Sequence, residues 1–448
     1  MKIKKVVVNN LFGIFHHEIP LNMENHITII HGPNGFGKTT LLKMINALFC
    51  SRYYELRRIP FDELFVDFDD KSKLHITKKV KHPNGKISPE ECNELTIEFK
   101  KGRSKPLSYI VKPLKQQEIP FPLGALEGEI PGLDRIGRET WLYTPTQEKL
   151  TLIEVLDRFK DYLPPPFLRT LGETEPEWLK NIRKSIPTRF IETQRLLFFS
   201  PSRRPRDYEG RPSMIPAVIN YSEQVTNMIQ STLAEYATLS QSLDRTFPTR
   251  LVKGGSATEL TLDDLRTNLD ELEKKRSRLI EAGLLDKGKE VDLKDLQNID
   301  EKNRNVLSVY IDDVKKKLRF LEDLTNKIDL LVKNINSRFL YKKMSISKKD
   351  GFIFKTADGN EISPIMLSSG EQHEIVLLFE LLFKVKPNTL ILIDEPEISL
   401  HVAWQQQFLK DLHGITKLAD FDVLIATHSP QIIHDRWDLT VKLEGPQN

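Results

Sequence analysis

The feature that most constrains this chain is a glycine-rich loop that lies between an apolar run and a helix-forming stretch. Residues 27–30 are apolar and rich in isoleucine, and the loop that follows reads Gly32-Pro33-Asn34-Gly35-Phe36-Gly37-Lys38-Thr39. Beyond Thr40, apolar residues recur at helical spacing through residue 49. A strand, a loop of the form G-x-x-x-x-G-K-[ST] and a helix together cradle phosphate groups. The sequence therefore predicts an α/β fold with a phosphate site at the end of a strand.

Each part of this loop has an expected role. The glycines allow backbone N–H groups to approach the phosphates without a Cβ in the way. Lys38 offers a point charge to the β and γ phosphates of ATP, and Thr39 a hydroxyl to Mg²⁺. The helix after the loop turns its positive end toward the anion. The candidate ATP-binding residues are Gly32, Pro33, Asn34, Gly35, Phe36, Gly37, Lys38, Thr39 and Thr40.

Two carboxylates late in the chain would complete such a site. The apolar run 390–393 predicts a strand that ends in Asp394 and Glu395, where ligands of parallel sheets collect. We expect Asp394 to help hold Mg²⁺, and Glu395 to orient and polarise the attacking water. The plain alternative is a buried strand that ends in a solvated acidic turn, and the phosphate loop elsewhere in the chain disfavours it.

With the segment Leu367-Ser368-Ser369-Gly370-Glu371, these motifs resemble the ABC-type ATPase heads of the SMC, Rad50, RecF and OLD group. The resemblance implies that Ser368 and Gly370, with Ser369 and Glu371 beside them, contact the γ-phosphate of ATP held by another copy. It therefore implies a homodimer or a higher homo-oligomer. The alternative for Ser368 is an ordinary N-cap of an amphipathic helix.

Two further segments match the same group. Residues 426–430 resemble its switch-histidine segment, which implies that His428 lies against the γ-phosphate. Residues 397–401 resemble its D-loop, with His401 where transporters usually carry aspartate. Gln194 follows a predicted strand at residues 189–192 and is the candidate Q-loop glutamine, in contact with ATP and Mg²⁺.

The motif order predicts two ATPase lobes, residues 1–215 and 341–448, that are separated by a helical insertion at residues 216–340. We expect antiparallel strands near residues 4–9, 14–21, 74–81, 94–100 and 107–111, and hairpin turns at 349–351 and 358–360. Leucine-rich heptads near 262–279 and 314–335 predict two helices. Helices of about 30 residues would either project on the order of 45 Å as a coiled-coil-like arm or fold back as a bundle.

Composition restricts the class of protein only in part. The chain has 448 residues and a formal charge of +3, which neither requires nor excludes nucleic acid. Two cysteines, Cys50 and Cys92, make a disulfide framework unexpected. No signal peptide or membrane-length apolar run is recognisable, so we expect a cytoplasmic protein without a membrane partner. A basic stretch contains Arg203, Arg204, Arg206 and Arg211. We expect it to be a solvated loop, which is the more common outcome than contact with nucleic acid.

The resemblance is to a stand-alone head, because no C-x-x-C hook, long arm or Toprim domain is expected. Such heads include the ATPase subunits of the Septu and PARIS anti-phage systems. The resemblance implies an ATP-hydrolysing ABC-type ATPase that dimerises through its heads and regulates a separate effector nuclease in anti-phage defence. A RecF- or SMC-like DNA-binding ATPase and a nucleotide-locked scaffold with little turnover are the alternatives.

Overall fold

The computed structural model describes residues 1–80, 93–111, 126, 130, 132–137, 139–144, 148–159, 175–191, 196–199, 214–252, 261–286 and 304–446. Its contacts divide the chain into two units. The first unit comprises Met1–Ile215 and Lys384–Asn448, and the second comprises Pro216–Phe383. The phosphate loop therefore belongs to the first unit. The segment 367–371, which is expected to contact the γ-phosphate, belongs to the second unit together with the helical insertion.

The first unit contains a five-stranded parallel sheet. Its order is β11 (Thr188–Ile191), β17 (Leu390–Asp394), β18 (Asp422–Thr427), β3 (Ile27–His31) and β19 (Thr440–Lys442). All five residues of β17 are buried, as expected of a continuous apolar strand with both sheet faces covered. Asp394 pairs with Ala426, and Ala426 pairs with Ile30, so three strands end at the same edge.

Helices and short turns continue these strands. Helix α1 (Lys38–Phe49) follows β3 and contacts β11, β17 and β18. Two 3-10 turns, η7 (Pro396–Ser399) and η8 (Trp437–Leu439), and two helices, α11 (Val402–Ala419) and α12 (Pro430–Ile433), belong to the C-terminal part. Because the strands are parallel, the segments that leave β3, β17 and β18 all begin at one edge of the sheet.

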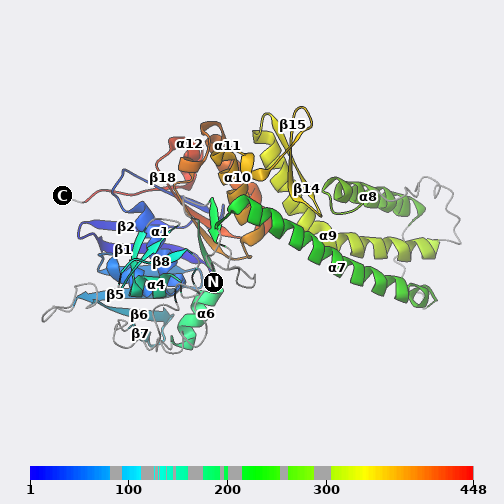
Figure 1. Ribbon diagram of the computed structural model, residues 1–448. Coiled ribbons are helices and arrows are strands. Elements are labelled where there is room, and N and C mark those ends of the chain that lie inside the picture. Colours follow the sequence, from blue (N-terminus) through cyan, green and yellow to red (C-terminus); the bar gives the residue numbers. More distant parts are fainter. Residues whose placement is uncertain are drawn as a thin grey trace. The chain divides into compact units, whose positions relative to one another are not determined.

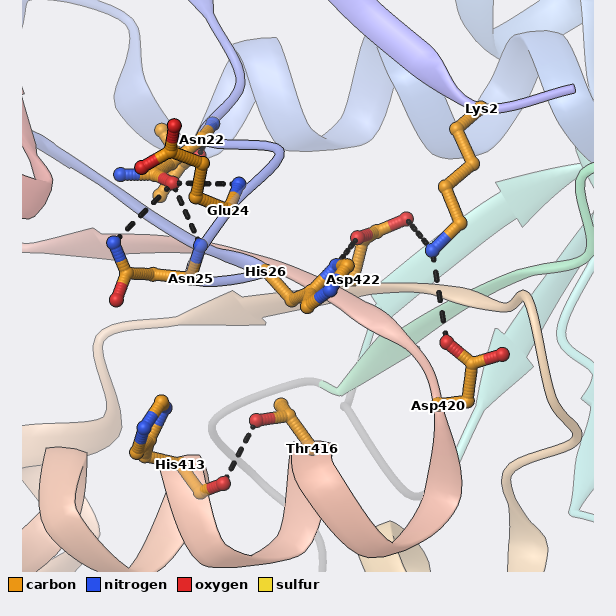
Figure 2. Close-up of polar contacts among 10 residues, drawn as sticks. Lys2, Asn22, Glu24, Asn25, His26, His413, Thr416, Asp420 and Asp422 are labelled. Atoms are coloured by element: carbon orange, nitrogen blue, oxygen red, sulfur yellow. Dashed lines mark hydrogen bonds and ion pairs between the residues drawn. The ribbon is translucent and has the colours of Figure 1, made fainter.

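The opposite edge of this sheet is held by charged side chains (Figure 2). His26 Nδ1 lies 2.7 Å from Asp422 Oδ1 where β3 and β18 begin, and Lys2 Nζ lies 3.4 Å from Asp422 Oδ2. Lys2 also lies 3.7 Å from Asp420. These contacts join the chain start to the amino ends of the strands, away from the edge that carries the phosphate loop.

An antiparallel sheet shares its core with the parallel one. Its order is β2 (Phe15–Pro20), β1 (Ile3–Leu11), β4 (Glu63–Phe68), β5 (Ser72–Val80), β6 (Asn93–Lys101) and β7 (Leu107–Val111). Most of these strands lie where the sequence predicts them, whereas β4 and the helix α2 (Tyr53–Arg58) had no expectation. The remaining elements are short: β8 (Leu133–Arg135), β9 (Thr140–Tyr143), β10 (Glu148–Thr151), α4 (Leu152–Arg158), α6 (Glu177–Ser185), β12 (Leu197–Phe199) and β13 (Met214–Pro216).

Three helices, not the two expected, form most of the second unit: α7 (Ala217–Val252), α8 (Leu262–Glu281) and α9 (Arg304–Arg338). Helices α7 and α8 both pack against α9 (Figure 1). The expectation was wrong because α7 lacks a heptad series, and its buried residues end at Ile229. The heptad positions that the sequence marks face inward, among them Leu265, Leu272, Leu318, Leu321 and Leu331.

A small antiparallel sheet and a helix complete the second unit. The sheet contains β14 (Lys342–Ser347), β15 (Gly351–Thr356) and β16 (Glu361–Ile362), and its hairpins confirm both predicted turns. A 3-10 turn, η5 (Pro364–Met366), precedes α10 (Ser369–Phe379), and a π-helical turn, η6 (Glu380–Lys384), follows it. Arg338 at the end of α9 makes a buried ion pair with Glu374 on α10.

The α/β class with antiparallel N-terminal strands and a helical insertion is confirmed. Several residues named in the sequence analysis lie outside the described part of the chain: Cys92, Gln194 and the arginines at 203, 204, 206 and 211. Among the helices that the structure describes, none is both long and apolar enough to cross a bilayer.

Candidate active site

The phosphate loop has a shape that depends on glycine. Gly35 and Gly37 adopt φ angles of +85° and +80°, and Gly37 is the N-cap of α1. A Cβ on Gly37 would lie 2.9 Å from Leu11 Cδ2, whereas one on Gly35 would meet nothing. Gly37 is therefore required both by its backbone conformation and by its neighbour. Pro33, Asn34 and Gly35 form the exposed part of the loop.

Lys38 is buried, with 4% of its surface exposed, and its ammonium is fully engaged. Nζ donates to the carbonyl oxygens of Gly32 at 2.8 Å and Pro33 at 3.0 Å, and it lies 3.2 Å from His428 Nδ1. Burial lowers the pKa of Lys38, and the charge of Glu395 opposes this most strongly. An ammonium has three N–H donors, and each has a partner here. A phosphate would replace partners that are weaker acceptors than itself.

Thr39 and Asp394 meet across the edge of the sheet. Thr39 Oγ1 donates to Asp394 Oδ1 at 2.9 Å. Burial raises the pKa of Asp394, against the effect of the Thr39 hydrogen bond, and the charge of Glu395 raises it further. A buried carboxylate beside a hydroxyl supplies the oxygen ligands that Mg²⁺ prefers. Burial outweighs the lowering effects of the Thr39 hydrogen bond and the Lys43 charge on the pKa of Asp394, so the residues present fit a divalent cation.

Glu395 occupies a strained backbone position directly after β17. Its φ is +43°, in the left-handed region, which costs a non-glycine residue about 1–3 kcal/mol. Its N–H donates to Ala426 O at 2.8 Å, and one of its carboxylate oxygens lies 3.5 Å from His428 Nε2. Strain of this size persists where neighbouring structure imposes it, and it is frequent at functional sites.

His428 lies between the loop and this carboxylate. Since the Lys38 ammonium can only donate, His428 Nδ1 must accept, and we therefore assign the ring proton to Nε2. That N–H faces Glu395. The three side chains form a continuous line: Lys38 lies at the start of α1, His428 directly follows β18 and Glu395 directly follows β17.

The expected γ-phosphate residues lie in the second unit, at the start of α10. Ser368 is the N-cap of this helix, and its hydroxyl accepts a hydrogen bond from Glu371 N at 3.3 Å. The Glu371 carboxylate accepts from Ser368 N at 2.8 Å and from Lys342 Nζ at 2.7 Å. Burial alone would raise the pKa of Glu371, but these hydrogen bonds outweigh the effect of burial, and the pKa is lowered. Ser368 and Ser369 are exposed. Ser368 therefore caps α10, and the first-turn N–H groups of Ser369 and Gly370 have no partner within the helix.

The sequence interpretation missed several side chains that support the site. Glu397 and Gln405 bond to the segment that carries His428, and His17 lies 2.9 Å from the Phe36 carbonyl oxygen. Glu397 is separated from its partners by 30 to 32 residues, so no local spacing could have indicated these bonds. The order of the strands is what brings them together.

A parallel sheet whose carboxyl edge carries a phosphate loop, a threonine–aspartate pair and a following glutamate defines the P-loop class of nucleotide-binding proteins. The chain belongs to the AAA ATPase domain family, whose model matches residues 1–433. No curated protein is similar enough to the chain to count as a match.

Similar solved structures include three SMC heads. The SMC head domain from Thermotoga maritima has 11% identity and a TM-score of 0.33, with 99% of this chain and 94% of that chain covered. The Smc head domain with an extended coiled coil, bound to the C-terminal domain of ScpA and derived from Pyrococcus furiosus, has 12% identity, a TM-score of 0.30 and coverages of 96% and 91%. An SmcHead bound to the C-winged helix domain of ScpA has 11% identity, a TM-score of 0.31 and coverages of 97% and 91%. At these scores, nothing further about this chain follows from the likeness.

Proposed function

We propose that the chain binds Mg²⁺ and ATP at residues 32–40 and hydrolyses ATP to ADP and phosphate. The observation that carries this proposal is the 2.9 Å hydrogen bond between Thr39 and Asp394, which joins residues 355 positions apart. It places the loop hydroxyl and the strand-end carboxylate at one point, as a Mg²⁺-dependent phosphate site requires. Membership of the AAA ATPase domain family supports the same conclusion.

Binding begins with Lys38. Its ammonium exchanges the Gly32 and Pro33 carbonyl oxygens for oxygens of the β and γ phosphates. The loop N–H groups and the start of α1 supply further positive potential. Thr39 and Asp394 would hold Mg²⁺, which supplies charge neutralisation at the phosphates when bound.

Hydrolysis depends on Glu395 and His428. The Glu395 carboxylate orients and polarises the attacking water, because phosphoryl transfer relies on positioning and charge stabilisation more than on covalent chemistry. The His428 N–H holds this carboxylate from the side of β18. The test is Glu395→Gln, which should abolish phosphate release and leave ATP affinity nearly unchanged. Unchanged turnover would exclude this role for Glu395.

We infer that a second copy completes the site with its Ser368, Ser369, Gly370 and Glu371. Exposed apolar residues adjoin the start of α10 in two places. Ile365 and Met366 come shortly before Ser368 in the chain, and Leu340 and Tyr341 come before Lys342, which bonds to Glu371. Exposed apolar residues that lie together mark interaction surfaces. Burying them against another copy would bring the N–H groups of α10 to the γ-phosphate.

A mixing experiment tests the two-chain site. Lys38→Ala and Ser368→Ala are each expected to be inactive. Mixed in equal amounts, they should recover about a quarter of the wild-type turnover, because half of the dimers are mixed and each holds one intact site. If the mixture stays inactive while mixed dimers demonstrably form, the inference fails.

We propose that the output of the cycle is control of a separate effector nuclease, in the cytoplasm and in anti-phage defence. This part of the proposal is supported by the resemblance to the Septu and PARIS ATPase subunits. An effector should be retained by the Glu395→Gln variant with ATP and lost from Lys38→Ala. DNA-stimulated turnover with a steep salt dependence would instead favour the DNA-binding alternative.

A further inference from the structure

Glu397 makes an unusual set of contacts beside the site. It lies in η7, two residues after Glu395, and its Oε1 accepts hydrogen bonds from Thr427 Oγ1 at 2.8 Å, His428 N at 2.8 Å and Ser429 N at 3.2 Å. Its Oε2 is buried and has no hydrogen-bond partner among the described residues. A buried acceptor without a donor costs free energy. This cost offsets part of the stability that the three bonds contribute. Two of these bonds come from the backbone N–H groups of His428 and Ser429, and the third comes from the Thr427 hydroxyl.

Gln405 on α11 anchors the same segment from a second side. It is 8% exposed, and its side-chain oxygen accepts from Ser429 Oγ at 2.9 Å. Its Nε2 donates to the carbonyl oxygens of Glu397 and Leu400, each at 3.2 Å. The turn after β17, helix α11 and the end of β18 are thus joined by side chains that reach backbone atoms.

We propose that Glu397 is a positioning residue that acts through His428, an inference that rests on the proposed hydrolysis. Its bonds hold the peptide N–H groups of His428 and of the next residue, so they set where the ring lies. The ring makes two contacts, with Lys38 at 3.2 Å and Glu395 at 3.5 Å. A displacement of about 1 Å in such an arrangement costs on the order of 10²-fold in rate.

A competing route is purely electrostatic. Glu397 is one of the carboxylates whose charge raises the pKa of Lys38 against the larger effect of burial. If this charge were its main contribution, removing it would weaken phosphate binding at Lys38. The positioning role predicts a different result, in which the catalytic rate falls and ATP affinity does not.

Two substitutions separate these routes. Glu397→Gln removes the charge but keeps a carbonyl oxygen that can accept the three bonds now made to Oε1, whereas Glu397→Met has a similar length and lacks these acceptors. We expect kcat to fall about 10- to 100-fold in Glu397→Met, the range for residues that orient a functional group, with the Kd for ATP within about twofold of wild type, and we expect Glu397→Gln to stay close to wild type. Weaker ATP binding in both variants with unchanged kcat would overturn the positioning role.

A double-mutant cycle tests whether His428 is the intermediary. In a His428→Ala background, Glu397→Met should cause no further loss of kcat, because the group that it positions is absent. Multiplicative losses in the double variant would overturn the proposal. Glu177→Met is the matched control, since the Glu177 side chain is 77% exposed and pairs only with Lys180 among the described contacts.

Amide hydrogen exchange in the nucleotide-free protein provides a readout that does not need hydrolysis. The N–H groups of His428 and Ser429 should exchange faster in Glu397→Met, and to a smaller degree in Thr427→Val, which removes one of the three donors. Unchanged exchange in both variants would overturn the positioning role. A wild-type protein without turnover would contradict the proposed function instead, so the two failures are distinguishable.

Discussion

The Nζ atom of Lys38 lies 3.2 Å from Nδ1 of His428, and with two loop carbonyls this contact occupies all three ammonium donors. The same ring presents its other nitrogen to Glu395 at 3.5 Å. A phosphate that draws Lys38 away would therefore also release one side of the His428 ring. The loop lysine and the Glu395 carboxylate are thus linked through one imidazole.

Lys38→Met should remove ATP binding, because the methionine side chain is similar in length but carries no charge or donor. In the wild-type protein, ATP at about 100 times its Kd should stabilise the fold by about 2.7 kcal/mol. The variant should show no ATP-dependent rise in Tm. Lys410→Met, which changes an exposed lysine on α11, is the control and should keep the full rise.

Asp394→Asn should make the nucleotide-free protein more stable at pH 8. Burial raises the pKa of Asp394, so between its ordinary and raised values the folded state binds the extra proton. Stability due to this group is therefore lost as pH rises through the folded pKa, and the neutral amide avoids that loss. The gain in Tm should shrink toward pH 4, and Mg²⁺-dependent hydrolysis should disappear.

The comparison for this variant is Asp420→Asn, at a side chain that is 64% exposed. It should show no comparable gain. A lower Tm for Asp394→Asn than for wild type at pH 8 would contradict a carboxylate whose charged form is destabilised by burial.

Ser368→Ala should lower stability by about 1 kcal/mol, the usual value of an N-cap, and should also abolish hydrolysis. The structure offers a matched control in Thr261, which makes the same kind of capping box with Asp264 at the start of α8. Thr261→Ala should lower stability by a similar amount without loss of turnover. If Ser368→Ala and Thr261→Ala changed turnover equally, Ser368 would act only as a helix cap. Ser368→Thr, which keeps a hydroxyl, should retain part of the activity.

Gly37→Ala should destabilise the protein and weaken ATP binding, because its φ of +80° and the 2.9 Å approach of Leu11 both exclude a Cβ. Gly414→Ala is the opposite case. Gly414 lies within α11, and a Cβ there would meet nothing within 4 Å, so alanine should raise stability by about 0.5–1 kcal/mol. Thermal unfolding and ATP titration of both variants check this, and a stabilised Gly37→Ala would contradict the loop geometry.

Much of the local structure follows from short sequence patterns. The loop 32–39 lies between β3 and α1 as expected, and the hairpins around Gly351 and Gly359 form where turn residues occur. Heptad leucines correctly mark the inward faces of α8 and α9. The sequence did not predict helix α7. Only its first part is buried, so apolar residues do not repeat at helical spacing along its whole length. Strand β4 also had no expectation, although it lies beside β1 within the antiparallel sheet.

The sequence by itself determined which residues are candidates for the site, because a phosphate loop and a strand-end carboxylate are local patterns with few other uses. Only the tertiary structure decided how they meet. The order β17, β18, β3 places Asp394 against Thr39 and His428 between Lys38 and Glu395. It also revealed Glu397 and Gln405, whose partners are distant in the chain. Side-chain contacts of this kind depend on which strands pair. The pairing joins segments that are far apart in the chain, so the sequence of one segment does not determine it.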